Sequence, residues 1–238
     1  MKALDAILLA LLFAGFAAAS SADGLEPDVS CAAGVARKVQ AHYETVTDLS
    51  ARFVQTREAV IFGGGTAAPE PARQGTVVLS KPGRMRWSYE TPEPSLMITD
   101  GEVVWMYDPL LEEAQRLSDA GGLLSGAAVQ FLMGQGDLLA SFTVSARDCA
   151  ARPVRLDLVP KQDASYERLA LAVDPETGRV HSSAVTDLFG NRTTVTFEDV
   201  RVNVHPDAGL FRFTPPPGVS VIDLTTEPGP QGGVTEGP

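Results

Sequence analysis

The chain has 238 residues, with 30 Asp or Glu against 19 Lys or Arg, so its formal net charge at pH 7 is −11. A surface this acidic repels phosphate groups, which argues against nucleic acid as a partner and against an anionic membrane surface as the primary one. A length in this range suits one β-rich domain or two small ones.

The N-terminal segment has the layout of a cleaved secretory signal peptide. Met1-Lys2 gives a short positive start, residues 6–19 form an apolar run, and Ser20-Ser21-Ala22 ends it with small residues. The run is short for a membrane span, although a retained anchor helix is the alternative. We therefore expect residues 1–22 to be removed and the mature protein to be exported.

The chain has two cysteines, Cys31 and Cys149, which lie far apart in the sequence. Exported proteins work in oxidising compartments, where a pair of cysteines favours a disulfide, with two unpaired thiols as the alternative. Closing a loop of more than about 100 residues would contribute about 4–5 kcal/mol to the free energy of unfolding in the chain-entropy model.

The mature chain begins with a helical pattern. Val35, Val39, Tyr43 and Val46 fall on one stripe, which predicts a helix over about 31–46. Alternation with a period of two then begins at Leu49, so a first strand follows the helix directly. A loop rich in Gly and Pro comes next, around residues 63–71.

The rest of the chain alternates in short runs separated by turn residues. Asp100-Gly101 between two such runs is a strong hairpin signal. We expect further strands at 74–80, 84–90, 95–99, 102–107, 141–146, 153–159, 166–173, 179–187, 192–200 and 210–214. Consecutive hairpins of this kind build an antiparallel sheet.

Between residues 118 and 136 the alternation stops. Ser125 is a candidate helix cap, Gly134 is a candidate stop, and the apolar residues between them repeat at helical spacing. We therefore expect a short apolar helix that interrupts the sheet. Residues 225–238 are rich in Gly, Pro and acid and are expected to be disordered. The whole pattern predicts a single domain, 23–224, mainly β, with one curved sheet and helices on its concave side.

A search for catalytic motifs finds none. The serine in Gly122-Leu-Leu-Ser-Gly126 stands one place too late for a nucleophile elbow, and His42, His181 and His205 are too scattered to predict a metal site. No phosphate-binding loop, Cys-x-x-Cys or dinucleotide fingerprint occurs. The sequence argues for binding, without a cofactor or metal, rather than for an enzyme.

One stretch, residues 81–109, holds both tryptophans and three of the five methionines. Alternation puts Met85, Trp87 and Tyr89 on one face of a strand, and Arg84, Arg86 and Ser88 on the other. The apolar face is either an ordinary core or the wall of a binding cavity.

Four segments, in order across essentially the whole mature chain, resemble the periplasmic outer-membrane lipoprotein carrier family, LolA. They are DLSARFVQT (48–56), GTVVLSKPGRMRWSYETP (75–92), LMITDGEVVWMYDP (96–109) and LFRFTPPPGVSV (210–221). The resemblance implies an unclosed antiparallel β-barrel, a half-barrel of about ten or eleven strands with a helical lid over an apolar cavity.

The resemblance also implies a function. It is that of a monomeric periplasmic carrier without catalytic activity, which accepts acylated lipoproteins from an ABC-type exporter in the inner membrane. The carrier shields their acyl chains and delivers them to the outer membrane, through a receptor where one is present. The alternatives are a regulatory protein that senses lipids or lipoproteins, and a carrier of another amphiphile such as a glycolipid.

Site residues follow from the same resemblance. Lys81 falls where well-studied members carry an arginine that hydrogen-bonds the lid, and lysine keeps the charge but loses the planar fork, so we expect a single-contact lid latch. The cysteine pair departs from the pattern of the best-known members and would tie the first helix to the sheet. The expected lid residues are Leu124, Phe131, Leu132 and Met133. The expected cavity residues are Phe53, Met85, Trp87, Tyr89, Leu96, Ile98, Trp105 and Tyr107.

Overall fold

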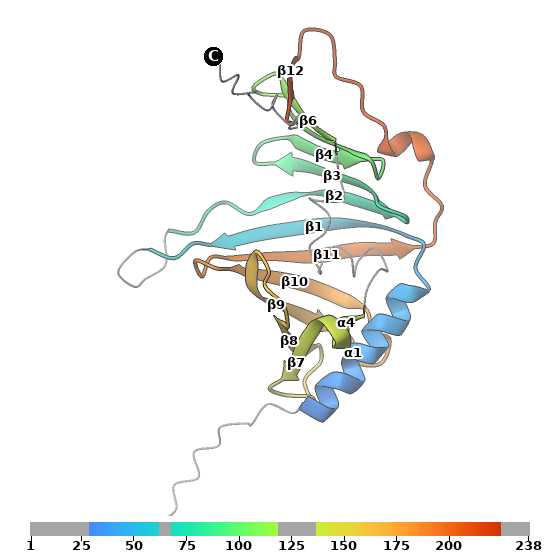
Figure 1. Cartoon of the computed structure of the whole chain (residues 1–238), viewed down its shortest axis with the longest axis vertical. Helices are drawn as coiled ribbons and strands as arrows, with labels where there is room; N and C mark the ends of the chain where they lie inside the picture. The colour runs from blue at the N-terminus through green and yellow to red at the C-terminus, as the bar shows by residue number, and fades with distance from the viewer. Residues whose placement is uncertain (1–28, 62–67, 119–136, 225–238) are drawn as a thin grey trace, which may run out of the picture.

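The computed structural model describes residues 29–61, 68–118 and 137–224 (Figure 1). The expected signal peptide and C-terminal tail lie outside these ranges. So do the expected middle helix and all four predicted lid residues, Leu124, Phe131, Leu132 and Met133. Within the described ranges, no helix has the length and apolar character needed to cross a bilayer.

The described strands form one open sheet. Their bounds are β1 Asp48–Glu58, β2 Arg73–Ser80, β3 Arg84–Thr91, β4 Ser95–Thr99, β5 Val103–Asp108, β6 Glu113–Ser118, β7 Phe142–Ala146, β8 Val154–Pro160, β9 Tyr166–Val173, β10 Val180–Asp187, β11 Arg192–Val202 and β12 Ser220–Asp223. The spatial order is β12-β6-β5-β4-β3-β2-β1-β11-β10-β9-β8-β7, with different strands at its two ends. The predicted unclosed, mainly β architecture is therefore confirmed, with twelve described strands where ten or eleven were expected.

β1 lies in the middle of the strand order, and its side chains alternate between the two faces of the sheet. Leu49, Ala51 and Phe53 are buried, whereas Arg52 between them is exposed. One face of β1 therefore belongs to the core and the other faces outward. The hairpin predicted at Asp100-Gly101 is also present, since β4 and β5 pair antiparallel. Asp100 Oδ1 accepts the N–H of Val103, the first residue of β5, at 3.0 Å.

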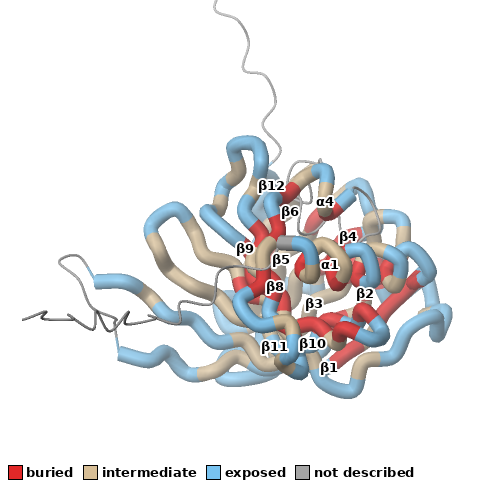
Figure 2. The backbone as a smooth tube through the Cα atoms, turned by 90° about the horizontal axis from the view of Figure 1, so that it is seen from below, coloured by how far each residue is buried: buried red, intermediate tan, exposed pale blue. Residues whose placement is uncertain are grey.

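The helix predicted over about 31–46 is present as α1, Val29–Glu44. Its apolar stripe is buried in the main core, and Figure 2 shows the buried positions gathered around α1 and the strands that it faces. The turn between β9 and β10 fixes the helix in place. Lys38 Nζ donates to Pro175 O at 2.7 Å, and a Cβ at Gly178 would collide with the Lys38 carbonyl, so only glycine permits this approach.

A second, four-residue helix, α4 Leu138–Ser141, packs between α1 and β7. Asp137 caps its first turn, because its Oδ1 accepts the N–H groups of Leu139 and Ala140. Buried Leu138 joins the same apolar core. The sequence pattern did not predict this helix.

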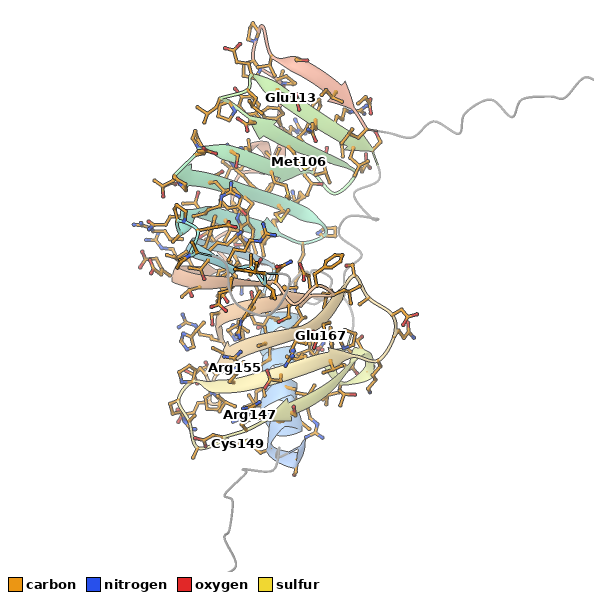
Figure 3. All side chains as sticks on the ribbon, turned by 90° about the vertical axis from the view of Figure 1, so that its left-hand side faces the viewer. Met106, Glu113, Arg147, Cys149, Arg155 and Glu167 are labelled. Carbon is orange, nitrogen blue, oxygen red and sulfur yellow. A yellow bond between two sulfur atoms is a disulfide. The ribbon has the colours of Figure 1, made fainter. Side chains whose placement is uncertain are left out.

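The predicted disulfide between Cys31 and Cys149 is confirmed. It joins α1 to the loop between β7 and β8, so it ties the first helix to the edge of the sheet (Figure 3).

The C-terminal part corrects the sequence prediction. Residues 210–214 are not a strand, because Ala208–Phe211 form a 3₁₀ helix, η1, whose first turn is capped by Asp207. The last strand is instead β12, which pairs in parallel with β6. Both β6 and β12 escaped prediction: β6 has a single fully buried residue, Ala114, and β12 is exposed throughout, so neither shows clear alternation.

Replacing both cysteines, Cys31→Ser with Cys149→Ser, should lower the free energy of unfolding by about 4 kcal/mol, since the open chain gains loop entropy when it unfolds. Guanidinium titration measures this loss, and wild-type protein unfolded under reducing conditions is the control that should match the variant. A loss below about 1 kcal/mol in the variant would contradict the stabilising role of the bond.

Candidate functional site

An aromatic cluster lies on the face of the sheet against which α1 packs, which we call the inner face. Phe53 of β1 is 1% exposed, and its ring centroid lies 4.7 Å from that of Trp87 and 5.2 Å from that of Tyr89, both on β3. Trp87 and Tyr89 are only half-buried, and they pack against the main core together with Met97 of β4. The cluster thus extends the core into a partly open apolar surface.

Polar contacts hold Tyr89 in place at the margin of this surface. Its hydroxyl donates to Gln55 Oε1 at 2.9 Å, and the Arg73 guanidinium lies 3.7 Å from the ring centroid. Burial raises the pKa of Tyr89, and the positive charge of Arg73 offsets part of that rise. The ring is therefore fixed as an apolar wall while its hydroxyl is satisfied.

The strand register divides the eight predicted cavity residues between two faces. Directly paired residues share a face, and Trp87 pairs with Met97, whereas Arg86 pairs with Ile98 and Ile98 pairs with Trp105. Ile98 and Trp105 therefore lie on the opposite, outer face. The residues on the inner face are Phe53, Met85, Trp87 and Tyr89, and those on the outer face are Leu96, Ile98, Trp105 and Tyr107.

This division corrects the expectation that all eight residues line one cavity. Alternation gives the two faces of each strand, but it does not say which face of one strand continues that of the next. The hairpin turn between two strands decides which of their faces lie on the same side of the sheet. On β4 and β5 the apolar inner-face positions are Met97, Val104 and Met106, which sequence reasoning did not select.

The outer-face residues are covered by the C-terminal strap, residues 203–219. The Phe213 ring lies 5.5 Å from Trp105 and 5.3 Å from Tyr107, measured between ring centroids. Ile98 beneath them is fully buried, and so is Phe211 in η1. These side chains form a small second core under the strap rather than part of the inner surface.

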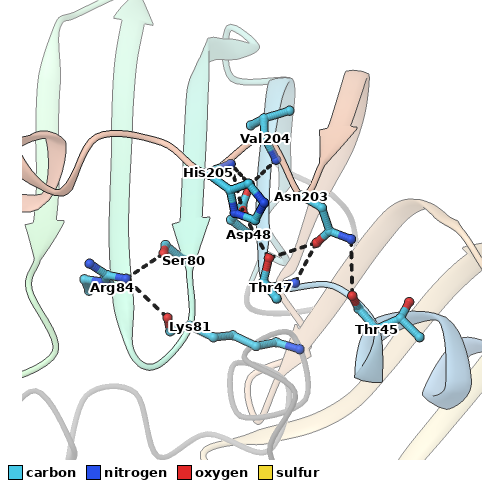
Figure 4. A network of polar contacts seen from close by, with 9 residues as sticks. All are labelled: Thr45, Thr47, Asp48, Ser80, Lys81, Arg84, Asn203, Val204 and His205. Atoms are coloured by element: carbon cyan, nitrogen blue, oxygen red, sulfur yellow. Dashed lines mark hydrogen bonds and ion pairs between the residues drawn. The ribbon is translucent and has the colours of Figure 1, made fainter.

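A buried carboxylate anchors the start of the strap (Figure 4). Asp48 Oδ1 accepts the backbone N–H of Val204 at 2.7 Å and of His205 at 3.2 Å, and Thr47 Oγ1 donates to Oδ2 at 3.0 Å. Asn203 and His205 have positive φ angles of 58° and 53°, which non-glycine residues rarely adopt. Asp48 therefore holds the sharp exit of the chain from β11, which directs the strap across the outer face.

Lys81, the predicted lid latch, contacts α1. Its Nζ donates to the Tyr43 carbonyl at 2.6 Å, at the C-terminal end of the helix, where a positive charge complements the helix dipole. Burial lowers the pKa of Lys81, and the nearby Glu44 carboxylate acts in the opposite direction. The lid is outside the described residues, so the latch stays a prediction.

The described ranges hold no group of three or more His, Cys, Asp or Glu side chains placed to bind a metal ion. Of the three histidines, His205 lies beside Asp48, with Nδ1 3.4 Å from Oδ2, in the strap anchor. The inner face therefore offers a ligand apolar contact area.

The sequence model of the family described as outer membrane lipoprotein carrier protein LolA matches residues 44–214. An outer-membrane lipoprotein carrier protein of Dechloromonas aromatica is 30% identical over 191 residues, covering 80% of this chain and 88% of that protein. One of Pseudomonas paraeruginosa is 34% identical over 181 residues, covering 73% and 80%. A solved structure of an uncharacterized conserved protein from Thermus thermophilus has a TM-score of 0.49 at 14% identity, covering 81% of this chain and 98% of that one.

Replacing Asp48 with Ala should lower the free energy of unfolding by about 2–4 kcal/mol, because the N–H groups of Val204 and His205 lose their hydrogen bonds to this buried carboxylate. Trypsin should also cleave faster at Arg212 as the strap detaches. Asp148→Ala is the matched control: this exposed carboxylate also accepts two backbone N–H groups, and its loss should cost less. Equal effects of the two changes would contradict a special role for Asp48.

Proposed function

Because the chain belongs to the family of outer membrane lipoprotein carrier proteins, LolA, we propose that it carries acylated lipoproteins through the periplasm to the outer membrane. The observation that carries this proposal is the family match over most of the chain, joined by relatives at 30–34% identity that bear the same name. The donor is an ABC-type exporter of the inner membrane, and the acceptor is an outer-membrane receptor where one exists.

The inner face suits such cargo on physical grounds. Burial of each methylene group of an acyl chain contributes about 0.8 kcal/mol to the free energy of binding. A carrier therefore needs a wide apolar area rather than directed hydrogen bonds. Trp87, Tyr89, Met97 and Met106 supply half-buried apolar side chains on adjacent strands. The two methionines are flexible and can repack around chains of different shape, which favours binding that is both unselective and reversible.

The four inner-face residues predicted from sequence remain in the proposed site, and the outer-face four are replaced. Phe53 and Met85 are its buried residues, and the rings of Trp87 and Tyr89 pack against that of Phe53. Met97 and Met106 continue the surface along β4 and β5.

The purified protein should release lipoproteins from spheroplasts into the soluble fraction. Met106→Gln should reduce the released amount at least several-fold, because the polar amide disfavours the acyl chain. Val103→Gln on the outer face of the same strand is the control and should release as wild type does. If the wild-type protein releases no acylated substrate, the carrier proposal fails.

If Lys81 helps to hold the lid closed, Lys81→Leu should change the rate of lipid uptake or of transfer to acceptor membranes. Lys161→Leu is the matched control, because Lys161 Nζ likewise donates to a backbone carbonyl, that of Leu139, at 2.6 Å. The rate of transfer of a labelled lipoprotein should change in Lys81→Leu and stay at the wild-type value in Lys161→Leu. Wild-type rates in Lys81→Leu would remove the latch role.

A further inference from the structure

The turn between β10 and β11 exposes two large apolar side chains, Leu188 and Phe189, which are 65% and 85% accessible to solvent. Val60 and Ile61, just beyond the end of β1, are 49% and 51% accessible. The two segments meet: Val60 N donates to Asn191 Oδ1 at 3.0 Å, and both lie at the left-hand ends of their strands in Figure 1. We call Val60, Ile61, Leu188 and Phe189 the apolar tip.

The tip is held in position. Asp187 Oδ1 accepts the N–H groups of Phe189 and Asn191, each at 2.9 Å, and Oδ2 accepts Asn191 Nδ2 at 2.8 Å. Gly190 closes the turn with a φ of 88°, a conformation that favours glycine. The carboxylate therefore fixes a turn that presents Phe189 to solvent. Apolar side chains gathered on a structured surface mark a site that another surface covers.

Beside the tip, the outer face of β8 to β11 has a hollow of about 230 Å³, which is lined in part by Val60 of the tip and by Gly190 of the turn that carries Leu188 and Phe189. Three guanidinium groups line it, those of Arg155, Arg168 and Arg192, against the carboxylates of Glu58 and Asp157. Arg155 Nε and Asp157 Oδ1 are 3.9 Å apart, and Figure 3 labels Arg155 on its strand, β8. The lining carries three positive charges against two negative ones, although the whole chain is acidic. Glu167 beside the hollow pairs with Arg168 at 2.9 Å, so Arg192 is the arginine of the lining that has no ion pair among the described residues.

The exposed apolar side chains of the tip and the adjoining arginines match the two layers of a lipid surface, the acyl chains and the phosphates. Acyl chains accept the apolar side chains, and the phosphates above them accept hydrogen bonds from arginine in a fork geometry that lysine does not provide. We propose that the protein docks on a phospholipid bilayer through the apolar tip, with the arginines of the adjoining hollow on lipid phosphates. This activity goes beyond cargo binding on the inner face.

A second exposed apolar turn differs from the tip in the charges around it, and this difference favours the tip as the membrane-docking site. Leu110 and Leu111, between β5 and β6, are 62% and 72% accessible, and Asp108 Oδ1 accepts both of their N–H groups. The turn is therefore similar to the tip in exposure and in hydrogen bonding. However, Asp108, Glu112 and Glu113 flank it, and these acids repel a phosphate surface.

The test is flotation of the purified full-length protein with vesicles of phosphatidylethanolamine and phosphatidylglycerol. The wild type should float, and Leu188→Ser with Phe189→Ser should weaken binding at least about tenfold. Leu110→Ser with Leu111→Ser is the matched control and should float as wild type does. Arg168→Gln with Arg192→Gln should weaken binding and reduce its dependence on salt.

A second readout follows insertion itself. Phe189→Trp should shift its fluorescence to shorter wavelength when vesicles are added, as the indole leaves water. Absence of wild-type flotation, or equal flotation by the Leu188→Ser/Phe189→Ser variant, would overturn the proposal. A concentration-dependent dimer that the same variant abolishes, without flotation, would assign the tip to a second copy and overturn it too. Met106→Gln should float normally, which separates this test from the cargo test.

Discussion

An open sheet has two faces, and the apolar side chains on both must be covered, since no second sheet packs against this one among the described residues. The register of the ladder from β1 to β6 decides which side chains go to which face. On the inner face, α1 and α4 cover the strands at the β7 end. On the outer face, the strap covers Ile98, Trp105 and Tyr107, and the buried Asp48 carboxylate fixes its path.

This arrangement gives the two ends of the inner face different roles. At the β7 end, helix and sheet form a closed core that the disulfide ties together. Toward β3, β4 and β5 the aromatic and methionine side chains are only half-buried, so apolar area is available there without loss of the core. A carrier needs both parts, because a stable fold must persist while the lipid site fills and empties.

Much of the fold follows from local patterns, and the main errors come from relations between segments. Alternation identified β1 to β5 and β7 to β11, and the spacing of Val35, Val39 and Tyr43 identified α1. β6 and β12 were missed because β6 has one fully buried residue and β12 is exposed throughout, so neither alternates clearly, and η1 was predicted as a strand. Likewise, Ile98 and Trp105 were wrongly assigned to the lipid site, because only the pairing shows which face of one strand continues that of the next. Nothing in the local pattern signalled that Asp48 would be buried under the exit from β11.

The central claim is that lipid contacts the inner face of β3 to β5 and not the outer one. A lipoprotein carrying a photoactivatable acyl chain tests it directly: after illumination, mass spectrometry locates the adducts in the carrier. Adducts are expected at Trp87, Met97 and Met106. Adducts at Ile98, Trp105 or Tyr107 instead would contradict it.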